Sequence, residues 1–309
     1  MRPTRRLPAV ALAFAILVAC TSGASPASPT TTSTTPVSAT APTTGTAPKP
    51  ETSETTSTST TLPNPAAEPN QDILTVVPGV LTVGTESLES PWYVGSTPES
   101  VTAGFEYDLA KALAARLGVS SVRVIVTPLV SLLSGQDCRC DLMLSQVLVT
   151  DDRARRADLT EPYLTVDQAV LVRTGVSMAN IAEGRSFRWG VAMKNAAGLD
   201  VITKRIKPTT APNVLVDESD GINRVADGRL DAMILQTPYA LAAAAANPGL
   251  AVAGQLRTGE LYAGALALGS PNTAALNDAI GNMRDDGTIA LFLRQYFGMN
   301  PADVPEIPS

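Results

Sequence analysis

Hydrophobic and polar positions in the last 239 residues, 71–309, follow the period of helices in some segments and of buried strands in others. In residues 105–118 (FEYDLAKALAARLG), Leu109, Leu113 and Leu117 fall on one helical face. Acidic side chains open this helix, and a glycine follows it. The pattern predicts strands at residues 81–85, 122–126, 141–145, 169–173, 188–193, 230–235 and 262–268, and a closing helix over residues 274–296.

This alternation of strands and helices indicates an α/β protein with parallel sheets. Because residues 71–309 begin and end with similar units, we expect two lobes.

The start of the chain has the pattern of a secretory signal. Three arginines precede residues 7–19, which carry no charge. This run is shorter than the roughly 20 apolar residues that cross a bilayer, and it fits the apolar region of a signal peptide. It ends in residues 17–20 (LVAC), which resemble the lipobox of bacterial lipoproteins. We therefore expect removal of residues 1–19 and lipidation of Cys20; the alternative is an ordinary signal peptide with an incidental cysteine.

Residues 20–70 differ in composition from the rest of the chain. Ser, Thr and Pro make up 33 of the 50 residues from 21 to 70. Such a segment buries too little apolar surface to offset the entropy of ordering it. The sequence therefore predicts a disordered tether between Cys20 and the folded part.

Composition and charge exclude several classes of protein. The chain has no histidine, which excludes Ser-His-Asp and Cys-His catalysis and histidine-ligated metals. The net charge of −6 is opposite to that of typical nucleic-acid binders. Three cysteines are too few for a disulfide scaffold or a four-cysteine zinc site. We expect no catalytic residue, metal, cofactor or nucleic-acid partner.

Five stretches in register resemble the solute-binding proteins of polar amino-acid ABC importers, family 3 of the extracellular solute-binding proteins. The resemblance covers essentially all of residues 75–298. It implies a type II periplasmic-binding-protein fold, in which two α/β lobes are joined by two crossover strands with a ligand cleft between them. The stretches are residues 81–118, 141–164 (DLMLSQVLVTDDRARRADLTEPYL), 188–202 (RWGVAMKNAAGLDVI), 228–241 (GRLDAMILQTPYAL) and 276–298.

The resemblance also implies the limits of the lobes. Residues 71–172 form the first part of lobe one, and residues 173–261 form lobe two. Residues 262–309 return to lobe one and include the C-terminal tail.

Thr150 and Arg153 form the first candidate site. Thr150 can cap a short helix, and an arginine can form a bidentate pair with a carboxylate. Taken alone, this is a capping motif with a solvated arginine. The resemblance implies that both residues grip a ligand carboxylate, whereas Arg155 and Arg156 on the same helix stay solvated.

Three further candidates depart from the family pattern. Asn195 stands where relatives have a Gly-Thr pair, so we expect it to contact the ligand or only to cap a helix. Gln236 replaces the aspartate that pairs with the ligand ammonium, and Gln146 replaces a glycine. Either Glu86 receives the ammonium instead, or the ligand is a carboxylate with a neutral polar tail.

Trp92 and Glu86 complete the predicted site. Trp92 matches the position of an aromatic ring against the aliphatic part of the ligand, and core or hinge packing is the alternative. Glu86 matches an acidic reader of the ligand side chain, and a solvated loop residue is the alternative.

Cys138 and Cys140 remain as a pair once Cys20 is lipidated. Because an extracytoplasmic compartment is oxidising, we expect a local disulfide, with free thiols as the alternative.

These features predict a lipid-anchored, extracytoplasmic, monomeric binding protein that delivers a small carboxylate or amino acid to an ABC permease. The first alternative is a sensor that presents its closed form to a membrane receptor. An enzyme of the periplasmic dehydratase type is disfavoured because Gln236 does not titrate. A degenerate domain without a ligand is the remaining alternative.

Overall fold

The computed structural model describes residues 73–309. The predicted signal peptide, the lipidation site Cys20 and the predicted tether lie outside these residues. None of the helices within residues 73–309 combines the length and the apolar character that crossing a bilayer requires.

The first lobe begins with parallel strands beneath a helix. β1 (Val80–Thr85) pairs with β2 (Ser121–Val126) and β3 (Leu142–Leu148). Helix α1 (Phe105–Arg116) connects β1 to β2 and buries the predicted apolar face completely at Leu109 and Leu113. The lobe also contains the 3-10 helix η1 (Pro98–Ser100), α2 (Leu129–Leu133), α3 (Asp151–Ala154) and β4 (Ala157–Leu159).

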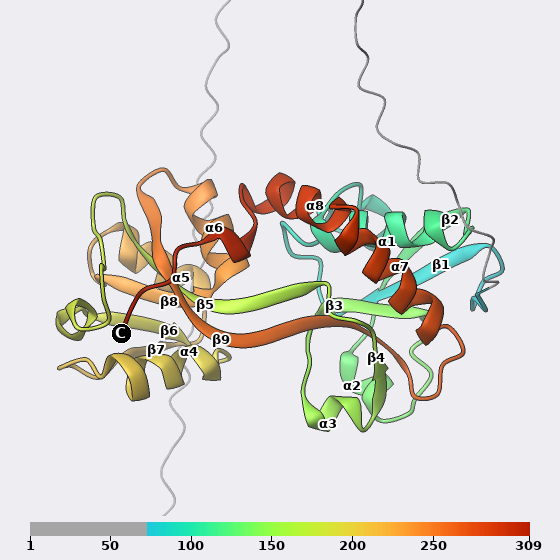
Figure 1. Ribbon diagram of the computed structural model, residues 1–309, viewed down its shortest axis with the longest axis horizontal. Coiled ribbons are helices and arrows are strands. Elements are labelled where there is room, and N and C mark those ends of the chain that lie inside the picture. Colours follow the sequence, from blue (N-terminus) through green and yellow to red (C-terminus); the bar gives the residue numbers. More distant parts are fainter. Residues whose placement is uncertain (1–72) are drawn as a thin grey trace, which may run out of the picture. The chain divides into compact units, whose positions relative to one another are not determined.

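Two long strands connect the lobes. β5 (Leu164–Arg173) leaves the first lobe, and β9 (Leu250–Ala267) returns to it; the two are antiparallel and lie side by side (Figure 1). Both contribute buried residues to the cores of the two lobes. Within residues 73–309 the strands form one nine-stranded sheet, ordered β2-β1-β3-β9-β5-β8-β6-β7, with β4 paired to β9. The predicted two-lobed α/β fold is confirmed, although the crossover strands pair antiparallel.

The second lobe repeats the parallel arrangement. β6 (Trp189–Ala192) pairs in parallel with β7 (Asn213–Leu215) and with β8 (Ala232–Gln236). Trp189 and Ile202 are fully buried in its core. The helices of this lobe are η2 (Glu183–Ser186), α4 (Ala196–Asp200), the π-helix η3 (Val201–Ile206), α5 (Glu218–Ala226) and α6 (Thr237–Ala246).

The closing helix is divided in two, so the prediction of one continuous helix over residues 274–296 is wrong. α7 (Thr273–Asp285) and α8 (Thr288–Phe297) are separated at Gly287, which has a φ of 81°. Glycine adopts this left-handed conformation without the steric cost that other residues meet. The five residues 284–288 (RDDGT) carry no apolar side chain, and the Asp-Gly pair within them is typical of a turn. The sequence therefore contains a signal for the break, which the prediction of one helix overlooked.

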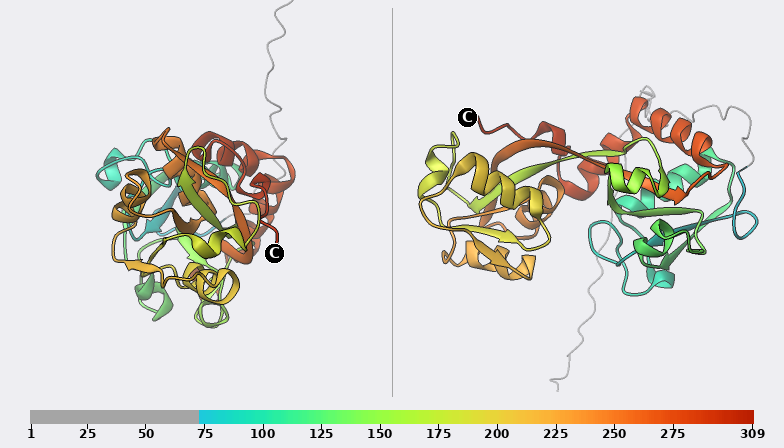
Figure 2. Two further views of the ribbon diagram at one scale, coloured as in Figure 1. Left: turned by 90° about the vertical axis from the view of Figure 1, so that its left-hand side faces the viewer. Right: turned by 90° about the horizontal axis from the view of Figure 1, so that it is seen from below.

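The C-terminal tail packs against the second lobe. After η4 (Pro301–Asp303), the side chain of Ile307 is buried in the second-lobe core. The backbone N–H of Gln255 donates to Pro305 O, and the N–H of Ile307 donates to Gln255 O. The right-hand view of Figure 2 shows the C-terminus among the second-lobe elements.

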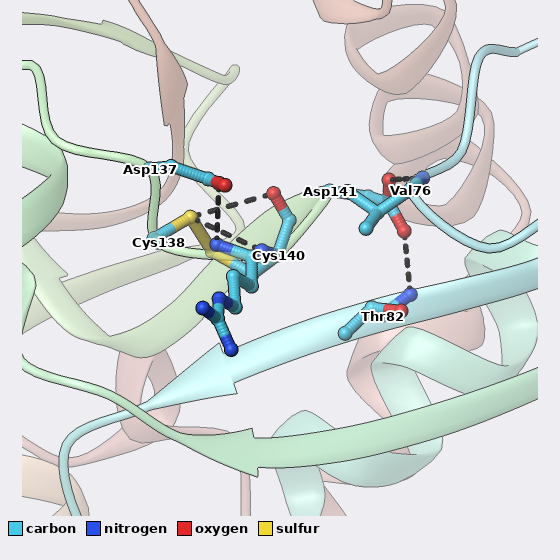
Figure 3. The surroundings of a disulfide bond; sticks show 7 residues. Val76, Thr82, Asp137, Cys138, Cys140 and Asp141 are labelled. Carbon is cyan, nitrogen blue, oxygen red and sulfur yellow. Dashed lines mark hydrogen bonds between the residues drawn. A yellow bond between two sulfur atoms is a disulfide. The ribbon is translucent and has the colours of Figure 1, made fainter.

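Cys138 and Cys140 are joined by a disulfide in the loop before β3 (Figure 3). A Cβ atom at Gly84 would lie 3.2 Å from Cys140 Sγ, so glycine lets the bridge approach β1. The next residue, Asp141, accepts hydrogen bonds from the N–H groups of Val76 (2.6 Å) and Thr82 (2.7 Å). Asp141 therefore ties the segment before β1 to the sheet.

We expect Asp141→Ala to destabilise the protein by about 3 kcal/mol, because it leaves two backbone donors without an acceptor. Urea denaturation measures this loss. Asp137→Ala is the matched control, since Asp137 is exposed and, among residues 73–309, accepts only from the Arg139 N–H two residues on. Its effect should stay within about 0.5 kcal/mol. Equal losses in both variants would contradict this role of Asp141.

Candidate functional site

A cavity of about 190 Å³ lies between the two lobes. Its walls come from the end of β3, the β6–α4 junction, the start of α5, the β8–α6 junction and β9. Most of the lining side chains carry a polar group, and one acidic and one basic side chain are among them. The lining residues are Ser145, Gln146, Leu148, Lys194, Asn195, Glu218, Gln236, Tyr239 and Tyr262.

Gln146 lies at an irregularity in β3, where the register with β9 shifts between Met143 and Val147. Its φ is 49°, a left-handed conformation that is unusual for a residue with a side chain. Both its backbone and its side chain are held by Glu106: Gln146 N donates to Oε1 (2.7 Å), and Nε2 donates to Oε2 (2.5 Å). Gln146 Oε1 accepts from Tyr239 Oη at 3.3 Å. These contacts fix the side chain at the cavity wall.

Glu106 is fully buried in the first turn of α1. It also accepts a hydrogen bond from Tyr163 Oη. Burial raises the pKa of the carboxyl to about 7, and the bonds from Tyr163 and Gln146 limit the rise. In the sequence, Glu106 was read only as one of the acidic side chains that open the helix. A signal existed, because Glu106 precedes Leu109 and Leu113 by three and seven residues and so lies on the apolar face of the helix.

Gln236 ends β8 with its amide held in one orientation. Its Oε1 accepts from Tyr262 Oη at 2.5 Å. Within residues 73–309 the Nε2 group makes no hydrogen bond. Because Gln236 lines the cavity, it offers donors there rather than an acceptor.

Asn195 serves as a cap and also lines the cavity. Its Oδ1 accepts from Gly198 N (2.9 Å) at the start of α4, and Nδ2 donates to Gln168 Oε1 (2.8 Å). Gln168 is fully buried, and its Nε2 donates a further hydrogen bond to Glu260 Oε2. One N–H of the Asn195 amide remains for a ligand.

Lys194 and Glu218 supply the two charges of the cavity wall. Lys194 Nζ lies 3.7 Å from Glu218 Oε2 and 6.0 Å from the centre of the Tyr239 ring. The Lys194 side chain is 64% exposed, but that of Glu218 only 21%. Burial raises the pKa of Glu218, and Lys194 counteracts the rise. Neither residue was a predicted ligand contact. Lys194 directly precedes the predicted Asn195 in the sequence, whereas only the fold brings Glu218 at the start of α5 to this cavity.

Trp92 does not reach the cavity, contrary to the expected ligand contact. The ring is fully buried, with centroids 5.7 Å from Tyr239, 5.8 Å from Tyr262 and 5.2 Å from Phe297. Trp92 follows proline in a loop, but the loop folds inward over the core. The ring thus supports the two tyrosines that line the cavity from behind.

Glu86 also lies away from the cavity lining. Its Oε1 accepts from Leu129 N at 3.1 Å, so it caps α2. This use of the carboxylate explains why it does not face the cavity.

Thr150 and Arg153 lie beside the cavity wall. Thr150 caps α3 by accepting from Arg153 N at 3.2 Å, and Arg153 Nη1 donates to the backbone oxygen of Leu148, a lining residue, at 2.8 Å. Arg153 forms no ion pair with any described residue. By contrast, Arg155 and Arg156 approach Asp152 on the exposed surface, at 3.7 and 3.0 Å. The guanidinium of Arg153 keeps donors available for an added anion.

The family model described as bacterial extracellular solute-binding proteins, family 3, matches residues 81–299. The L-cystine-binding protein TcyJ of Escherichia coli (strain K12) is 29% identical over 234 residues, covering 71% of this chain and 83% of the relative. A solved ancestral arginine-binding protein bound to arginine is 26% identical, with a TM-score of 0.54 and coverage of 71% and 99%.

A membrane-bound enzyme is also similar. The lytic murein transglycosylase F of Serratia proteamaculans (strain 568) is 27% identical over 229 residues, which cover 71% of this chain and 46% of the enzyme. The similarity therefore involves less than half of that enzyme.

We expect Glu106 to make stability depend on pH. Its folded pKa of about 7 exceeds the ordinary value of 4.5, so the folded state binds the extra proton. The stabilisation that this proton gives, measured as the free energy of unfolding, is fully present below about pH 4.5. It falls as the pH rises and is lost above about pH 7, a change of about 3 kcal/mol. Urea denaturation at pH 5 and pH 8 measures it. In Glu106→Gln the difference in unfolding free energy between pH 5 and pH 8 should shrink by about this amount. An unchanged difference in unfolding free energy would contradict the assignment.

Proposed function

Because the chain belongs to the bacterial extracellular solute-binding proteins of family 3, we propose that it captures an amino acid in the cavity between its lobes and delivers it to an ABC permease. The observation that carries this proposal is the charge pattern of the cavity. One carboxylate and one ammonium group lie 3.7 Å apart among amides and hydroxyls. A zwitterion complements such a pair.

Glu218 receives the ligand ammonium in this proposal. It is a largely buried carboxylate with a single, long ion contact, and burial penalises its charged form. A second cation brought by the ligand would relieve that penalty. Gln236 does not suit this task, because Tyr262 occupies its oxygen. Glu86 does not either, because it caps α2. The ammonium site is therefore displaced from the end of β8 to the start of α5.

The ligand carboxylate has several donors within reach of the cavity. Gln236 Nε2, one N–H of Asn195 and Lys194 Nζ line it, and Arg153 adjoins it through Leu148. Hydrogen bonds from charged donors contribute roughly 1.5–3 kcal/mol each. We propose that Arg153 turns toward the carboxylate when the lobes close.

Closure would take place where the two crossover strands lose their register. The pairing of β5 with β9 shifts between Val166 and Gln168. Asp167 between them accepts from the N–H groups of Thr258 (2.8 Å) and Gly259 (3.0 Å), and its side chain is paired with Arg257. A ligand that contacts both walls shifts the population toward the closed form, which a membrane partner can recognise.

We propose that lipidated Cys20 anchors the protein outside the cytoplasm and that residues 21–70 hold the binding lobes away from the membrane. We expect a monomer that does not catalyse a reaction. A sensor would use the same cavity but present the closed form to a receptor, and co-purification with permease subunits distinguishes the two roles.

A thermal-shift panel tests the proposed ligand class. We expect a zwitterionic amino acid among L-cystine, L-arginine, L-glutamine and L-glutamate to raise the unfolding temperature. At 100 times the dissociation constant, the shift should correspond to about 2.7 kcal/mol. Succinate, which lacks an ammonium, is the comparison compound. Stabilisation by succinate alone would contradict an amino-acid site.

We expect Glu218→Gln to weaken binding of the panel amino acid at least tenfold, because it removes the charged acceptor of the ammonium. Titration calorimetry measures the affinity. Asp220→Asn is the control on the same helix, since Asp220 pairs with Arg224 and does not line the cavity. Equal affinities of Glu218→Gln and the wild type would contradict the assignment.

We expect Arg153→Ala to abolish detectable binding of the same amino acid and Arg156→Ala to leave it unchanged. Arg153 lies in α3 and Arg156 directly after its C-cap, but Arg156 is paired with Asp152 on the surface. Equal losses in both variants would show that Arg153 is not the carboxylate anchor.

A further inference from the structure

Glu106 contacts the cavity only through Gln146, yet it determines which atoms Gln146 can present there. The carboxylate accepts from Gln146 Nε2 at 2.5 Å. This bond leaves Gln146 Oε1 facing Tyr239 at the cavity wall. We propose that Glu106 is a positioning residue whose protonation reverses the Gln146 amide, so that the cavity changes from offering an acceptor to offering a donor.

With Glu106 ionised, all hydrogen-bond partners are complementary. Both carboxylate oxygens accept, from Gln146 N, Gln146 Nε2 and Tyr163 Oη. Tyr239 donates its hydroxyl proton to Gln146 Oε1. An approaching ligand therefore meets the remaining acceptor capacity of this oxygen.

With a proton on Oε2, the same arrangement would place two donors against each other. Rotation of the amide by half a turn lets Gln146 Oε1 accept from Glu106 and lets Nε2 donate to Tyr239 Oη. The Tyr239 hydroxyl proton then turns toward the cavity, which Tyr239 lines. No buried donor is left without an acceptor.

A proton on Oε1 gives a poorer arrangement. Tyr163 would then have to accept it, and the hydroxyl proton of Tyr163 would lose its only acceptor among residues 73–309. Tyr163 is buried, so an unpaired donor there is costly. The reversal of the Gln146 amide is therefore the favoured response.

The groups that face Glu106 do not change their own charge near pH 7, so its titration can be told apart from theirs. It faces Tyr163, from the segment before β5, and the fields of Tyr93, Tyr239 and Tyr262 also reach it. Burial raises the pKa of all four tyrosines, so they remain neutral near pH 7. Among residues 73–309, no lysine or arginine forms an ion pair with Glu106. The chain has no histidine, and Glu218 is the other carboxyl in this region whose pKa is raised.

The consequence for ligands rests on the proposed function, whereas the amide reversal does not. At pH 8 the cavity should favour a ligand group that donates at Gln146. At pH 5.5 it should favour a group that accepts there.

The first experiment follows the Gln146 side-chain NH₂ signals of the ligand-free protein by NMR from pH 5.5 to 8. Their absence in Gln146→Met assigns them. We expect a single titration near pH 7 in the wild type and in Glu218→Gln, and constant low-pH positions in Glu106→Gln. Signals that do not titrate, or that titrate in Glu106→Gln, would overturn the proposal. If Glu106→Gln does not fold, the presence or absence of a titration near pH 7 in the wild type still tests the proposal.

The second experiment measures dissociation constants of L-arginine and L-glutamate at pH 5.5 and 8. The side chains of both ligands keep their charges over this pH range. The L-arginine side chain only donates hydrogen bonds, and the L-glutamate side chain only accepts them. We expect the preference for L-arginine to rise about tenfold toward pH 8 in the wild type and to stay constant in Glu106→Gln. If only one of the two amino acids binds, the test is the direction in which its dissociation constant changes between pH 5.5 and pH 8: L-arginine should bind more tightly at pH 8, and L-glutamate at pH 5.5. Binding of neither overturns the ligand consequence but not the amide reversal.

Discussion

The buried carboxylate of Glu106 is the interaction on which the rest of the site depends. It compensates the left-handed backbone of Gln146 with one bond to its N–H and fixes the side chain with another. The bulge that results places Ser145, Gln146 and Leu148 at one wall of the cavity. A fully buried ionisable group is costly, and three hydrogen bonds reduce that cost here. The candidate site is therefore built from inside the first lobe outward, and its outer residues follow from this core contact.

The second lobe completes the site with charge. Its contributions come from three separate junctions: Lys194 and Asn195 after β6, Glu218 at the start of α5, and Gln236 at the end of β8. Since all three lie at the ends of parallel strands or directly after them, the sheet brings them to one edge. The antiparallel crossover strands then set this edge opposite β3. The cavity presents the charge pair and two amides of the second lobe opposite Gln146 of the first lobe, which is a pattern suited to a small zwitterion.

Local patterns predicted the elements better than the contacts of individual side chains. The period of Leu109, Leu113 and Leu117 predicted α1, and the apolar runs predicted β1, β6 and β8 close to their observed limits. Trp92 was assigned to the cleft because its position matches that of a ligand-contacting aromatic ring in the resembled family. It is core instead, since only the tertiary fold shows which way the loop turns. Glu218 was not predicted, because nothing local distinguishes it from an ordinary first-turn acid. The break at Gly287 was missed, although residues 284–288 (RDDGT) interrupt the apolar pattern of the last helix.

The most direct test of this account is a crystal structure of the protein with the amino acid that stabilises it most. The account predicts the ligand in the cavity between the lobes, with its ammonium within hydrogen-bond distance of Glu218 and its carboxylate facing Gln236 and Arg153. A ligand whose ammonium faces Gln236 while Glu218 stays paired only with Lys194, or a ligand bound outside the cavity, would contradict it.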